Sequence, residues 1–390
     1  MTPRKRAEVI VVGLGAVGSA ALYQLARRGV PVIGIDRFSP PHTLGSSHGE
    51  TRITREGVGE GAVYTPLAIR SHEIWRELEA ATGLELLLTC GMLAIEPGAG
   101  GAAFHGRDDF LVASGAAAAA HGVPHEWLSA DEIRRRWPQF VLDGDERGYF
   151  EPGGGLVYPE RCIAAQLSEA ERLGATVVRD GQVTVLEETD EGVAAHTAGG
   201  SYSGAAMIVA AGAWTPGLLD LPAGMLTLQP QTLHWFAADD EKAYGADRFP
   251  TFIWSRGPGE GESAYGFPIA PGAPTRAVKV GVETRRSISR PEERDDLGPD
   301  PADVAFERAA VGRLSGLSAR VVKSAVCLYT ATSDSHFVIG RVPGRPRTLI
   351  ASACSGHGFK HSAAVGEMLA VAATEGDEGI PAAFDPARFA

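Results

Sequence analysis

Apolar and polar positions near the start of the chain form one continuous pattern of elements. Residues 9–12 are a short apolar run, a stretch with helical periodicity follows up to Gly29, and a second apolar run at 31–35 ends at Asp36. Short apolar runs are typical of buried strands, and apolar positions three and four residues apart are typical of helices. The pattern therefore predicts a strand, a glycine turn, a helix and a second strand that ends at an acidic residue.

The rest of the chain alternates helical and extended patterns and does not separate them into two blocks. Helical periodicity or capping residues predict helices within 64–81, 116–120, from 129 onward, 159–173 and up to 374. Apolar runs predict strands within 86–96, 175–178, 207–214 and 348–353, and the alternation over 228–282 predicts an antiparallel sheet. Residues 285–303 are charged and contain prolines, so we expect a surface loop there.

The turn after the first strand carries the glycines of a dinucleotide-binding motif. Gly13 permits a tight turn, Gly15 lets the backbone approach a pyrophosphate, and Gly18 lets helix and strand pack closely. The N-terminus of the helix offers positive partial charge to phosphates, and Asp36 can accept both hydroxyls of a ribose. A glycine turn that only packs is the alternative, but the flanking strands and the acidic residue favour dinucleotide binding.

Charge and length exclude several classes of function. The 390 residues include 36 Lys and Arg against 48 Asp and Glu, so we expect no nucleic-acid partner. No apolar run approaches the roughly 20 residues that cross a bilayer, and residues 1–7 are too short and polar for a secretory signal. We expect a soluble cytoplasmic protein without a membrane partner, long enough for two interleaved domains.

Cysteine usage indicates neither a metal site nor a disulfide framework. Cys90, Cys162, Cys327 and Cys354 are far apart and form no Cys-x-x-Cys pair. We therefore expect no metal. Taken alone, Cys327 is more typical of a buried apolar position than of a cofactor attachment.

Further characteristic segments lie along the whole chain: the Gly13 motif, 46–55, 64–68, 265–268, 278–281, the Cys327 segment at 326–337, and 355–360. Together they resemble the monomeric sarcosine oxidase and N-methyltryptophan oxidase family, flavoenzymes of the wider D-amino-acid-oxidase-like group. The resemblance runs essentially from end to end, and the combination is more specific than any single segment. One departure is Ser335, where the family motif has an acidic residue.

The resemblance implies FAD as the cofactor, attached through a thioether from Cys327 to the flavin 8α-methyl carbon. Glycine oxidases of the wider group generally hold FAD noncovalently, so the Cys327 segment distinguishes the two. Together with the alternating elements, the resemblance predicts an α/β fold (mixed α+β), in which a Rossmann-like FAD-binding domain is interleaved with a substrate domain on a mostly antiparallel sheet. We expect the FAD-binding domain at 1–90, 152–228 and 325–390, and the substrate domain at 91–151 and 229–324.

The resemblance also implies a set of residues that contact FAD. These are Gly13, Gly15, Ala16, Val17, Gly18, Asp36, Arg37, Ser47, His48, Thr51, Arg52, Val183, Gly212, Trp214, Cys327, Gly356, Gly358, Phe359 and Lys360. Arg52 is expected close to the flavin ring, with pairing to a phosphate or at the surface as the alternative.

Catalytic roles follow from the same resemblance and from the chemistry of an amino acid oxidase. Arg55 and Lys360 are expected to bind the substrate carboxylate, with surface salt bridges as the alternative. Lys279 matches the lysine that activates oxygen, because a fixed cation near the flavin stabilises superoxide; a plain strand lysine is the alternative. Tyr265 matches a further residue of the catalytic set.

Glu283 is a departure from the family pattern. The classical sarcosine oxidases have a histidine four residues after the oxygen-activating lysine, and this chain has Glu283 there. A carboxylate at this position would favour a cationic amine or accept a hydrogen bond from a secondary one. Pairing of Glu283 with Arg285 or Arg286 at a strand end is the structural alternative.

The sequence therefore predicts a flavin-dependent oxidase of secondary, N-methyl amino acids. Its partners would be a small amino acid and molecular oxygen, its products an imine that hydrolyses to aldehyde and primary amine, and hydrogen peroxide. We expect a monomer. The alternatives are oxidation of a cyclic imino acid of the pipecolate or proline type, a flavin-binding protein without turnover, and, from the glycine motif alone, a nicotinamide dehydrogenase.

Overall fold

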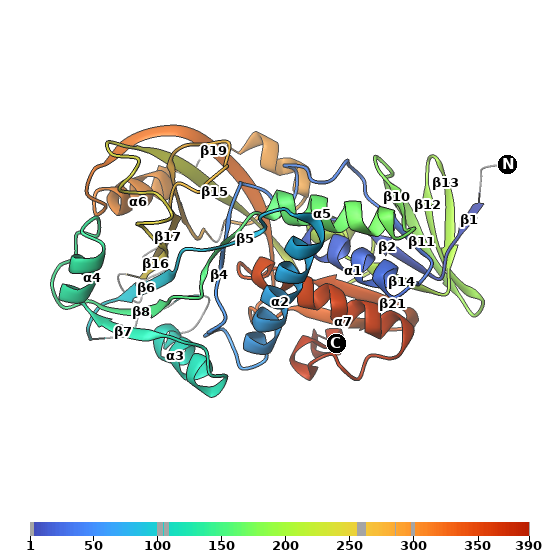
Figure 1. The fold of residues 1–390 in the computed structure, drawn as a ribbon. Coiled ribbons are helices and arrows are strands. Elements are labelled where there is room, and N and C mark those ends of the chain that lie inside the picture. The colour runs from blue at the N-terminus through green and yellow to red at the C-terminus, as the bar shows by residue number, and fades with distance from the viewer. Residues whose placement is uncertain are drawn as a thin grey trace.

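The computed structural model describes residues 4–99, 104, 109–255, 263–284, 286–297 and 301–389. In this part of the chain, two large sheets lie toward opposite ends of an elongated molecule (Figure 1). The chain passes between them several times, so each sheet combines segments that are far apart in sequence. The mixed α/β class is confirmed, and the division into two domains stays a prediction.

The first sheet has six strands and contains the predicted dinucleotide-binding elements. Its order is β10 (Thr176–Val178), β3 (Val32–Ile35), β2 (Val9–Val12), β14 (Ala206–Val209), β21 (Arg345–Ser352) and β20 (Val338–Val342). Neighbouring strands are parallel except β20 and β21. Every residue of β2, β3 and β14 is buried, because both faces of this sheet are covered.

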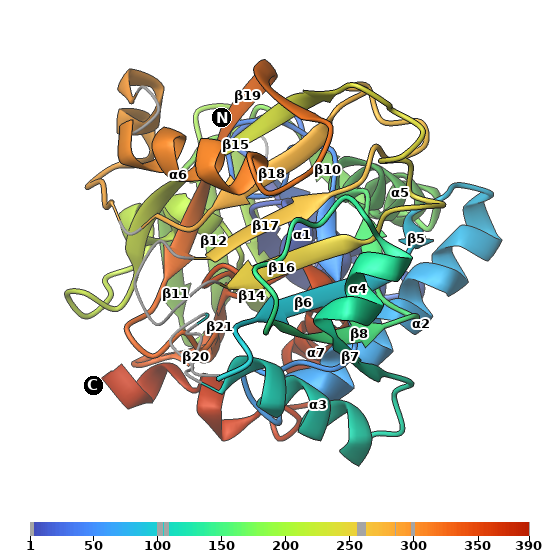
Figure 2. The ribbon, with the colours of Figure 1, turned by 90° about the vertical axis from the view of Figure 1, so that its left-hand side faces the viewer.

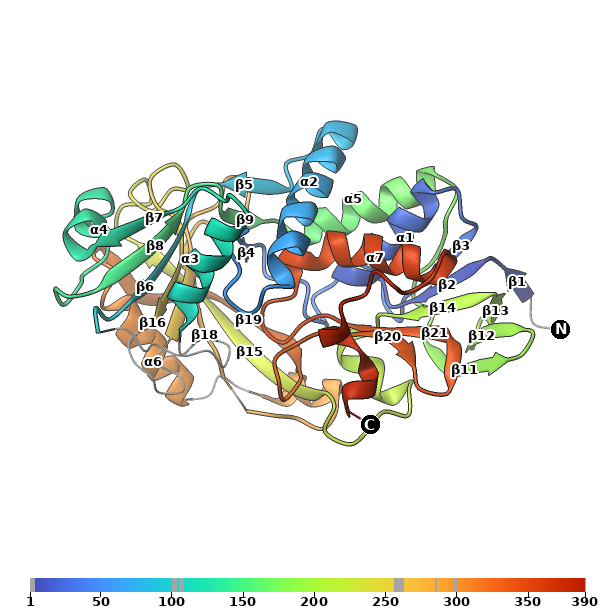
Figure 3. The same ribbon diagram turned by 90° about the horizontal axis from the view of Figure 1, so that it is seen from below.

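Helices cover one face of this sheet and a small antiparallel sheet covers the other (Figure 3). On the helical side, Val9 and Val11 pack with α1 (Ala16–Arg27), α5 (Pro159–Arg172) and α7 (Ser362–Thr374). On the opposite side, Ile10 and Val12 share a core with β11 (Val183–Thr189), β12 (Gly192–Thr197) and β13 (Gly200–Gly204), and β1 (Arg4–Arg6) pairs with β13. The sequence pattern does not predict β11, β12 and β13, because these strands are short and glycine or polar residues interrupt their apolar positions.

The second large sheet has eight strands. Its order is β19 (Leu317–Ala331), β15 (Thr227–Ala238), β18 (Val278–Val282), β17 (Ser263–Phe267), β16 (Thr251–Ser255), β6 (Met92–Glu96), β8 (Arg147–Glu151) and β7 (Glu126–Ser129). All neighbours are antiparallel except β16 and β6, which agrees with the antiparallel sheet expected over 228–282. The helices α3 (Phe110–Ala120), α4 (Ala130–Arg136) and α6 (Pro301–Val311) border it (Figure 2).

A third sheet and one further helix lie near the middle of the molecule in Figure 1, and the helix packs against α7 and α5. The sheet is β4 (Arg52–Thr54), β9 (Gly155–Val157) and β5 (Leu87–Thr89), and the helix is α2 (Tyr64–Thr82). The short 3₁₀ helices are η1 (Gly212–Gly217), η2 (Pro291–Asp296), η3 (Phe359–His361), η4 (Ala382–Phe384) and η5 (Pro386–Phe389). The strand β4 carries Arg52 and leads into Arg55, so this small sheet positions two of the predicted site residues.

The expected surface loop at 285–303 is wrong in part. Within its described residues, η2 begins at Pro291 and α6 begins at Pro301. Proline is accepted at the start of a helix because its missing N–H would have no partner there. The prolines therefore begin short helices in this segment. None of the helices in the described ranges is long and apolar enough to cross a membrane.

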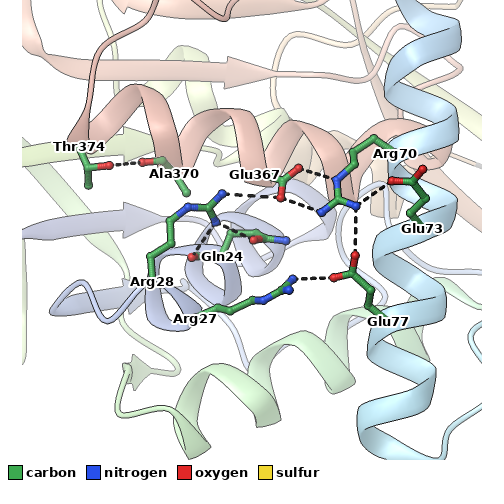
Figure 4. A network of polar contacts seen from close by, with 9 residues as sticks. All are labelled: Gln24, Arg27, Arg28, Arg70, Glu73, Glu77, Glu367, Ala370 and Thr374. Atoms are coloured by element: carbon green, nitrogen blue, oxygen red, sulfur yellow. Dashed lines mark hydrogen bonds and ion pairs between the residues drawn. The ribbon is translucent and has the colours of Figure 1, made fainter.

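A network of exposed charges joins three helices on the outside of the first sheet (Figure 4). Arg70 of α2 pairs with Glu367 of α7 at 2.8 Å and with Glu77 at 3.1 Å. Glu77 also accepts a hydrogen bond of 2.7 Å from Arg27 of α1. The hydrogen bond to Glu367 is the main cause that raises the pKa of Arg70. This surface charge network, defined by Arg27, Arg70, Glu77 and Glu367, lies outside the lining of the cavity described next.

Candidate active site

A cavity of about 460 Å³ is lined by residues from both large sheets. The lining begins at the Gly13 turn and Asp36 and includes Lys279 of β18 in the eight-stranded sheet and Glu283, which follows β18. Most of the predicted site residues therefore share one cavity, although they come from strands and turns spread over the whole chain. The lining contains Gly13, Gly15, Ala16, Val17, Asp36, Arg37, Ser47, Arg52, Arg55, Val183, Gly212, Trp214, Tyr265, Lys279, Glu283, Cys327, Gly356, Gly358, Phe359 and Lys360.

Three predicted FAD contacts do not belong to this lining. Gly18 is buried, and a Cβ atom there would lie 1.8 Å from the carbonyl oxygen of Gly13, so it serves the close packing of turn and helix. His48 is buried, and burial lowers its pKa to about 3, with the charge of Arg52 acting in the same direction. Thr51 faces other protein groups through its carbonyl oxygen, which accepts a hydrogen bond from Lys279.

The dinucleotide end of the cavity has the geometry that the glycine motif predicts. Gly13 has a φ of 89°, and a Cβ atom there would lie 2.6 Å from the carbonyl oxygen of Ala210, so no other residue fits. The nearest neighbour of a Cβ on Gly15 would be Ser47 Oγ at 3.7 Å, an ordinary contact. Packing within the protein therefore does not require glycine at 15, and the free space there suits a ligand. Asp36 accepts hydrogen bonds from the N–H groups of Leu14 (2.7 Å) and Phe38 (2.8 Å), which fix its carboxylate.

Lys279 is buried on β18 and points toward the turn before β4. Its Nζ donates to the carbonyl oxygens of Gly49 (2.9 Å) and Thr51 (2.6 Å) and lies 3.8 Å from the centre of the Phe267 ring. Burial and the nearby Arg52 lower its pKa, and Glu160 acts in the opposite direction. The amine of Lys279 is therefore buried in the cavity wall and held by two backbone carbonyl oxygens, and its role toward oxygen stays a prediction.

Cys327 lies on β19 with its thiol buried at the cavity. Its Sγ contacts the carbonyl oxygen of Gln231 at 3.8 Å. Burial raises the pKa of the thiol, whereas Arg52 and Lys279 lower it. The charges of Arg52 and Lys279 would favour the reactive thiolate form.

Arg55 and Lys360 form a buried cluster with Glu60, which the sequence reasoning missed. The Nη2 atom of Arg55 donates to both carboxylate oxygens of Glu60 at 2.8 and 2.7 Å, and Nη1 donates to the carbonyl oxygen of Gly57 at 2.6 Å. Lys360 Nζ lies 3.6 Å from Glu60 and donates to the carbonyl oxygen of His357 at 2.9 Å. The alternative of surface salt bridges is excluded, because all three side chains are buried.

Lys360 in this cluster loses its proton at a lower pH than an ordinary lysine. Burial lowers its pKa to about 8, against the opposing effect of Glu60. Glu60 lies in a glycine-rich segment without helical or strand periodicity, and so no sequence signal singled it out. The buried charge cluster, defined by Arg55, Glu60 and Lys360, lines the same cavity as Glu283.

Glu283 follows β18 and shares the lining with Tyr265 and Tyr329. Burial is the main cause that raises the pKa of both phenols, and the charge of Glu283 adds to it. Both tyrosines are therefore neutral hydroxyls near a carboxylate. Tyr329 was missed, although it stands two residues after Cys327 on one strand, where alternate side chains share a face. Arg285, one of the two arginines expected to pair with Glu283, lies outside the described residues.

Comparisons with known proteins agree with this arrangement. The family model "FAD dependent oxidoreductase" matches residues 8–372. A monomeric sarcosine oxidase of Streptomyces avermitilis is 36% identical over 392 residues, covering 98% of each chain. An N-methyl-L-tryptophan oxidase of Yersinia pestis is 32% identical over 384 residues, covering 98% of this chain and 99% of the relative.

Solved structures with the same fold include more distant proteins. The open form of NikD, an amino acid oxidase of nikkomycin biosynthesis, superimposes with a TM-score of 0.84 at 23% identity and covers 98% of each chain. An L-proline dehydrogenase of P. horikoshii gives a TM-score of 0.80 at 20% identity and covers 99% of this chain and 98% of its own. At this identity the likeness establishes the fold alone.

Proposed function

Because this chain belongs to the FAD dependent oxidoreductase family, we propose that it oxidises the carbon–nitrogen bond of secondary, N-methyl amino acids. The observation that carries the proposal is the grouping of Arg55, Lys360 and Glu283 in the cavity that begins at the dinucleotide turn. Two cations suit a carboxylate, and one carboxylate suits an amine. The cavity thus offers complementary groups for both ends of an amino acid.

The residues of the chain fit FAD at the other end of the cavity. Gly15 leaves room for a close backbone approach, α1 begins there without an acidic residue in its first turn, and Asp36 is fixed by two backbone N–H groups. Gly13, Gly15 and Asp36 would hold the adenosine and pyrophosphate parts. When bound, FAD supplies an acceptor for two electrons that molecular oxygen then takes up.

Arg55 and Lys360 would bind the substrate carboxylate, and Glu60 holds both cations in place beforehand. Arg55 uses Nη1 and Nη2 for Gly57 and Glu60, so its guanidinium is oriented before a ligand arrives. A substrate carboxylate would compete with Glu60 for the same two cations. Because one of these cations is Lys360, the affinity for the carboxylate depends on whether Lys360 is protonated.

Glu283 would accept a hydrogen bond from the substrate amine, and the neutral Tyr265 and Tyr329 would border it. Lys279 would provide the fixed positive charge that favours electron transfer to oxygen. Cys327 would carry the cofactor through a thioether from Sγ to the 8α carbon. The imine product would hydrolyse to an aldehyde and a primary amine, with hydrogen peroxide released.

A screen for peroxide formation tests this function. Purified protein is incubated with sarcosine, N-methyl aromatic amino acids, L-proline and L-pipecolate, and peroxide is measured in air-saturated buffer. We expect turnover with at least one N-methyl amino acid. Turnover of only the cyclic amino acids would favour the second candidate, a cyclic imino acid oxidase. No peroxide from any of them would favour a flavin-binding protein without turnover.

Substitutions in the cavity test the assigned contacts separately from turnover. Arg55→Ala should weaken the binding of a simple carboxylate such as benzoate about ten- to a hundredfold, since it removes a charge-assisted contact. Glu283→Gln should leave benzoate binding nearly unchanged, because benzoate has no amine, and should alter the affinity for amine-bearing substrates. If the two substitutions changed benzoate affinity equally, the assignment of Arg55 to the substrate carboxylate and of Glu283 to the substrate amine would be wrong.

The proposed covalent attachment of the flavin to Cys327 has its own test. Acid-precipitated protein should stay yellow, with the flavin mass on the peptide that contains Cys327, and Cys327→Ser should release the flavin into the supernatant. Wild-type protein that loses all its flavin on precipitation would contradict the thioether. The monomeric state and the cytoplasmic location belong to the same proposal, and size-exclusion chromatography and cell fractionation test them.

A further inference from the structure

Two functional cations are held through the backbone of two glycines. The carbonyl oxygen of Gly49 accepts a hydrogen bond from Lys279 (2.9 Å), and the carbonyl oxygen of Gly57 accepts one from Arg55 (2.6 Å). The two glycines lie on either side of β4, one before Arg52 and one after Thr54. The position of each cation therefore depends on the loop that carries its glycine.

Each of these loops is in turn held by a carboxylate. Glu160 Oε1 accepts hydrogen bonds from the N–H groups of Gly49 (2.7 Å) and Glu50 (3.0 Å). Glu151 accepts from the N–H of Glu56 (2.6 Å) through Oε1 and from the N–H of Gly57 (2.9 Å) through Oε2. The same arrangement thus occurs twice: a carboxylate holds the N–H of a glycine, and the carbonyl of that glycine accepts from a functional cation.

Both carboxylates belong to one short segment of the chain. Residues 151–160 begin at the end of β8, continue through β9 and end in the first turn of α5. Strand β9 pairs with β4 from Arg52 opposite Val157 to Thr54 opposite Gly155. The segment therefore contacts the backbone of β4 along its length and places one carboxylate at the loop beyond each end.

We infer that residues 151–160 act as a brace that positions Lys279 through Glu160 and Arg55 through Glu151. Neither Glu160 nor Glu151 lines the cavity, so both are positioning residues. Glu151 is fully buried and also accepts a hydrogen bond of 2.9 Å from the Tyr149 hydroxyl. Glu160 also favours the charged form of Lys279. The inference rests on the proposed function, since it assigns one carboxylate to the oxygen reaction and the other to substrate binding.

If residues 151–160 act as this brace, each of two variants should change one property and spare the other. A general loss of stability would change both properties in both variants. Glu160→Ala should slow reoxidation of the reduced flavin by oxygen about tenfold and leave the affinity for benzoate within about twofold of wild type. Glu151→Ala should weaken benzoate binding about tenfold and leave reoxidation within about twofold. Stopped-flow absorbance gives the reoxidation rate and calorimetric titration gives the affinity. Equal changes of both quantities in both variants would overturn the inference.

Amide hydrogen exchange provides a readout that needs no turnover and no cofactor. Exchange at Gly49 and Glu50 should become faster in Glu160→Ala, and exchange at Glu56 and Gly57 should become faster in Glu151→Ala. The variants Glu160→Gln and Glu151→Gln make this test more specific, and they can be used if an alanine variant fails to fold. Glu160 uses a single oxygen for both bonds, which glutamine can keep, whereas Glu151 uses both oxygens, of which glutamine keeps one. Faster exchange in Glu151→Gln but not in Glu160→Gln supports the brace, and the same exchange in both variants contradicts it.

Three controls separate this inference from the proposed function. Glu171→Ala changes a partly exposed acid of α5 that pairs with Arg179, and it should alter neither quantity. Lys279→Met and Arg55→Ala test the assigned roles themselves. If Lys279→Met reoxidises like wild type, the oxygen assignment fails. If Lys279→Met is slow and Glu160→Ala is not, the assignment stands and the brace is wrong.

Discussion

The surface charge network and the buried charge cluster use the same types of side chain in different surroundings. Arg70, Glu77 and Glu367 are partly exposed, and water can replace any lost partner. Arg55, Glu60 and Lys360 are buried, and a lost partner leaves a charge without water or counter-ion. The number of ion pairs therefore says little about stability, because burial decides the free-energy cost of breaking one.

The largest effect is expected from the buried cluster. Glu60→Gln removes the anion that neutralises Arg55 and Lys360, so the free energy of unfolding should fall by about 3–5 kcal/mol. Urea denaturation measures the change. Benzoate should restore part of the loss, because its carboxylate can take the place of Glu60 next to the two cations. A loss below about 1 kcal/mol would show that the buried cluster behaves like the surface network.

The second prediction concerns Lys279, a buried side chain whose amine donates hydrogen bonds to two backbone carbonyl oxygens. Lys279→Met keeps the length of the side chain and removes the charge held between Gly49 and Thr51. Reoxidation of the reduced flavin should slow by about 10²–10³-fold, as for the removal of one preorganised charge-stabilising group. Anaerobic reduction by substrate should change far less. Stopped-flow traces with unchanged reoxidation would place the oxygen site elsewhere.

The third prediction concerns pH and the charge of Lys360. Its pKa of about 8 in the folded state is below the ordinary value of 10.5, because burial disfavours the cation. The affinity for benzoate should therefore be nearly constant between about pH 6 and 7 and fall above pH 8, by about ten- to a hundredfold in total, because Arg55 keeps its charge. Lys360→Arg should move this fall beyond the accessible range, since arginine stays charged. If the affinity of the wild-type protein for benzoate did not change with pH, the lowered pKa of Lys360 would be wrong.

The same pKa has an opposite consequence for stability. Below pH 8 the side chain is charged in both states, and its burial costs free energy in the folded state. As the pH rises from about 8 to 10.5, the folded protein loses this proton before the unfolded chain does, so the cost is relieved. Lys360→Met should remove this contribution from the pH dependence of unfolding.

The smallest effect is expected from the surface charge network. Arg70→Ala breaks the contacts to Glu73, Glu77 and Glu367 at once, yet each is partly exposed. The free energy of unfolding should fall by about 1 kcal/mol or less, and more at low salt than at high salt. The affinity for benzoate should not change. A loss as large as that of Glu60→Gln would remove the distinction between the two regions.

Much of the site could be predicted because its elements carry local signals. The turn at Gly13, the strand that ends at Asp36 and the strand that carries Lys279 follow from periodicity and from motifs within a few residues. Cys327 and the arginines at 52 and 55 came from the resemblance, and the structure places all three in one cavity. The bounds of α6 did not follow, because its prolines and charged neighbours indicate a loop, and the strands β11 to β13 did not follow, because they are short and only one face of each packs in the core.

Elements whose conformation is local could be predicted from the order of residues, above all the glycine turn, where steric contacts allow no side chain at Gly13 or Gly18. Which charges meet depends on how the chain packs as a whole. Glu60 neutralises Lys360 across 300 positions of sequence, and Glu151 and Glu160 hold loops about a hundred residues before them. These contacts join a carboxylate to a remote cation or to a backbone N–H, and neither kind of partner leaves a periodic pattern in the sequence. Their energies arise from burial, which exists only once both sheets have packed around the cavity.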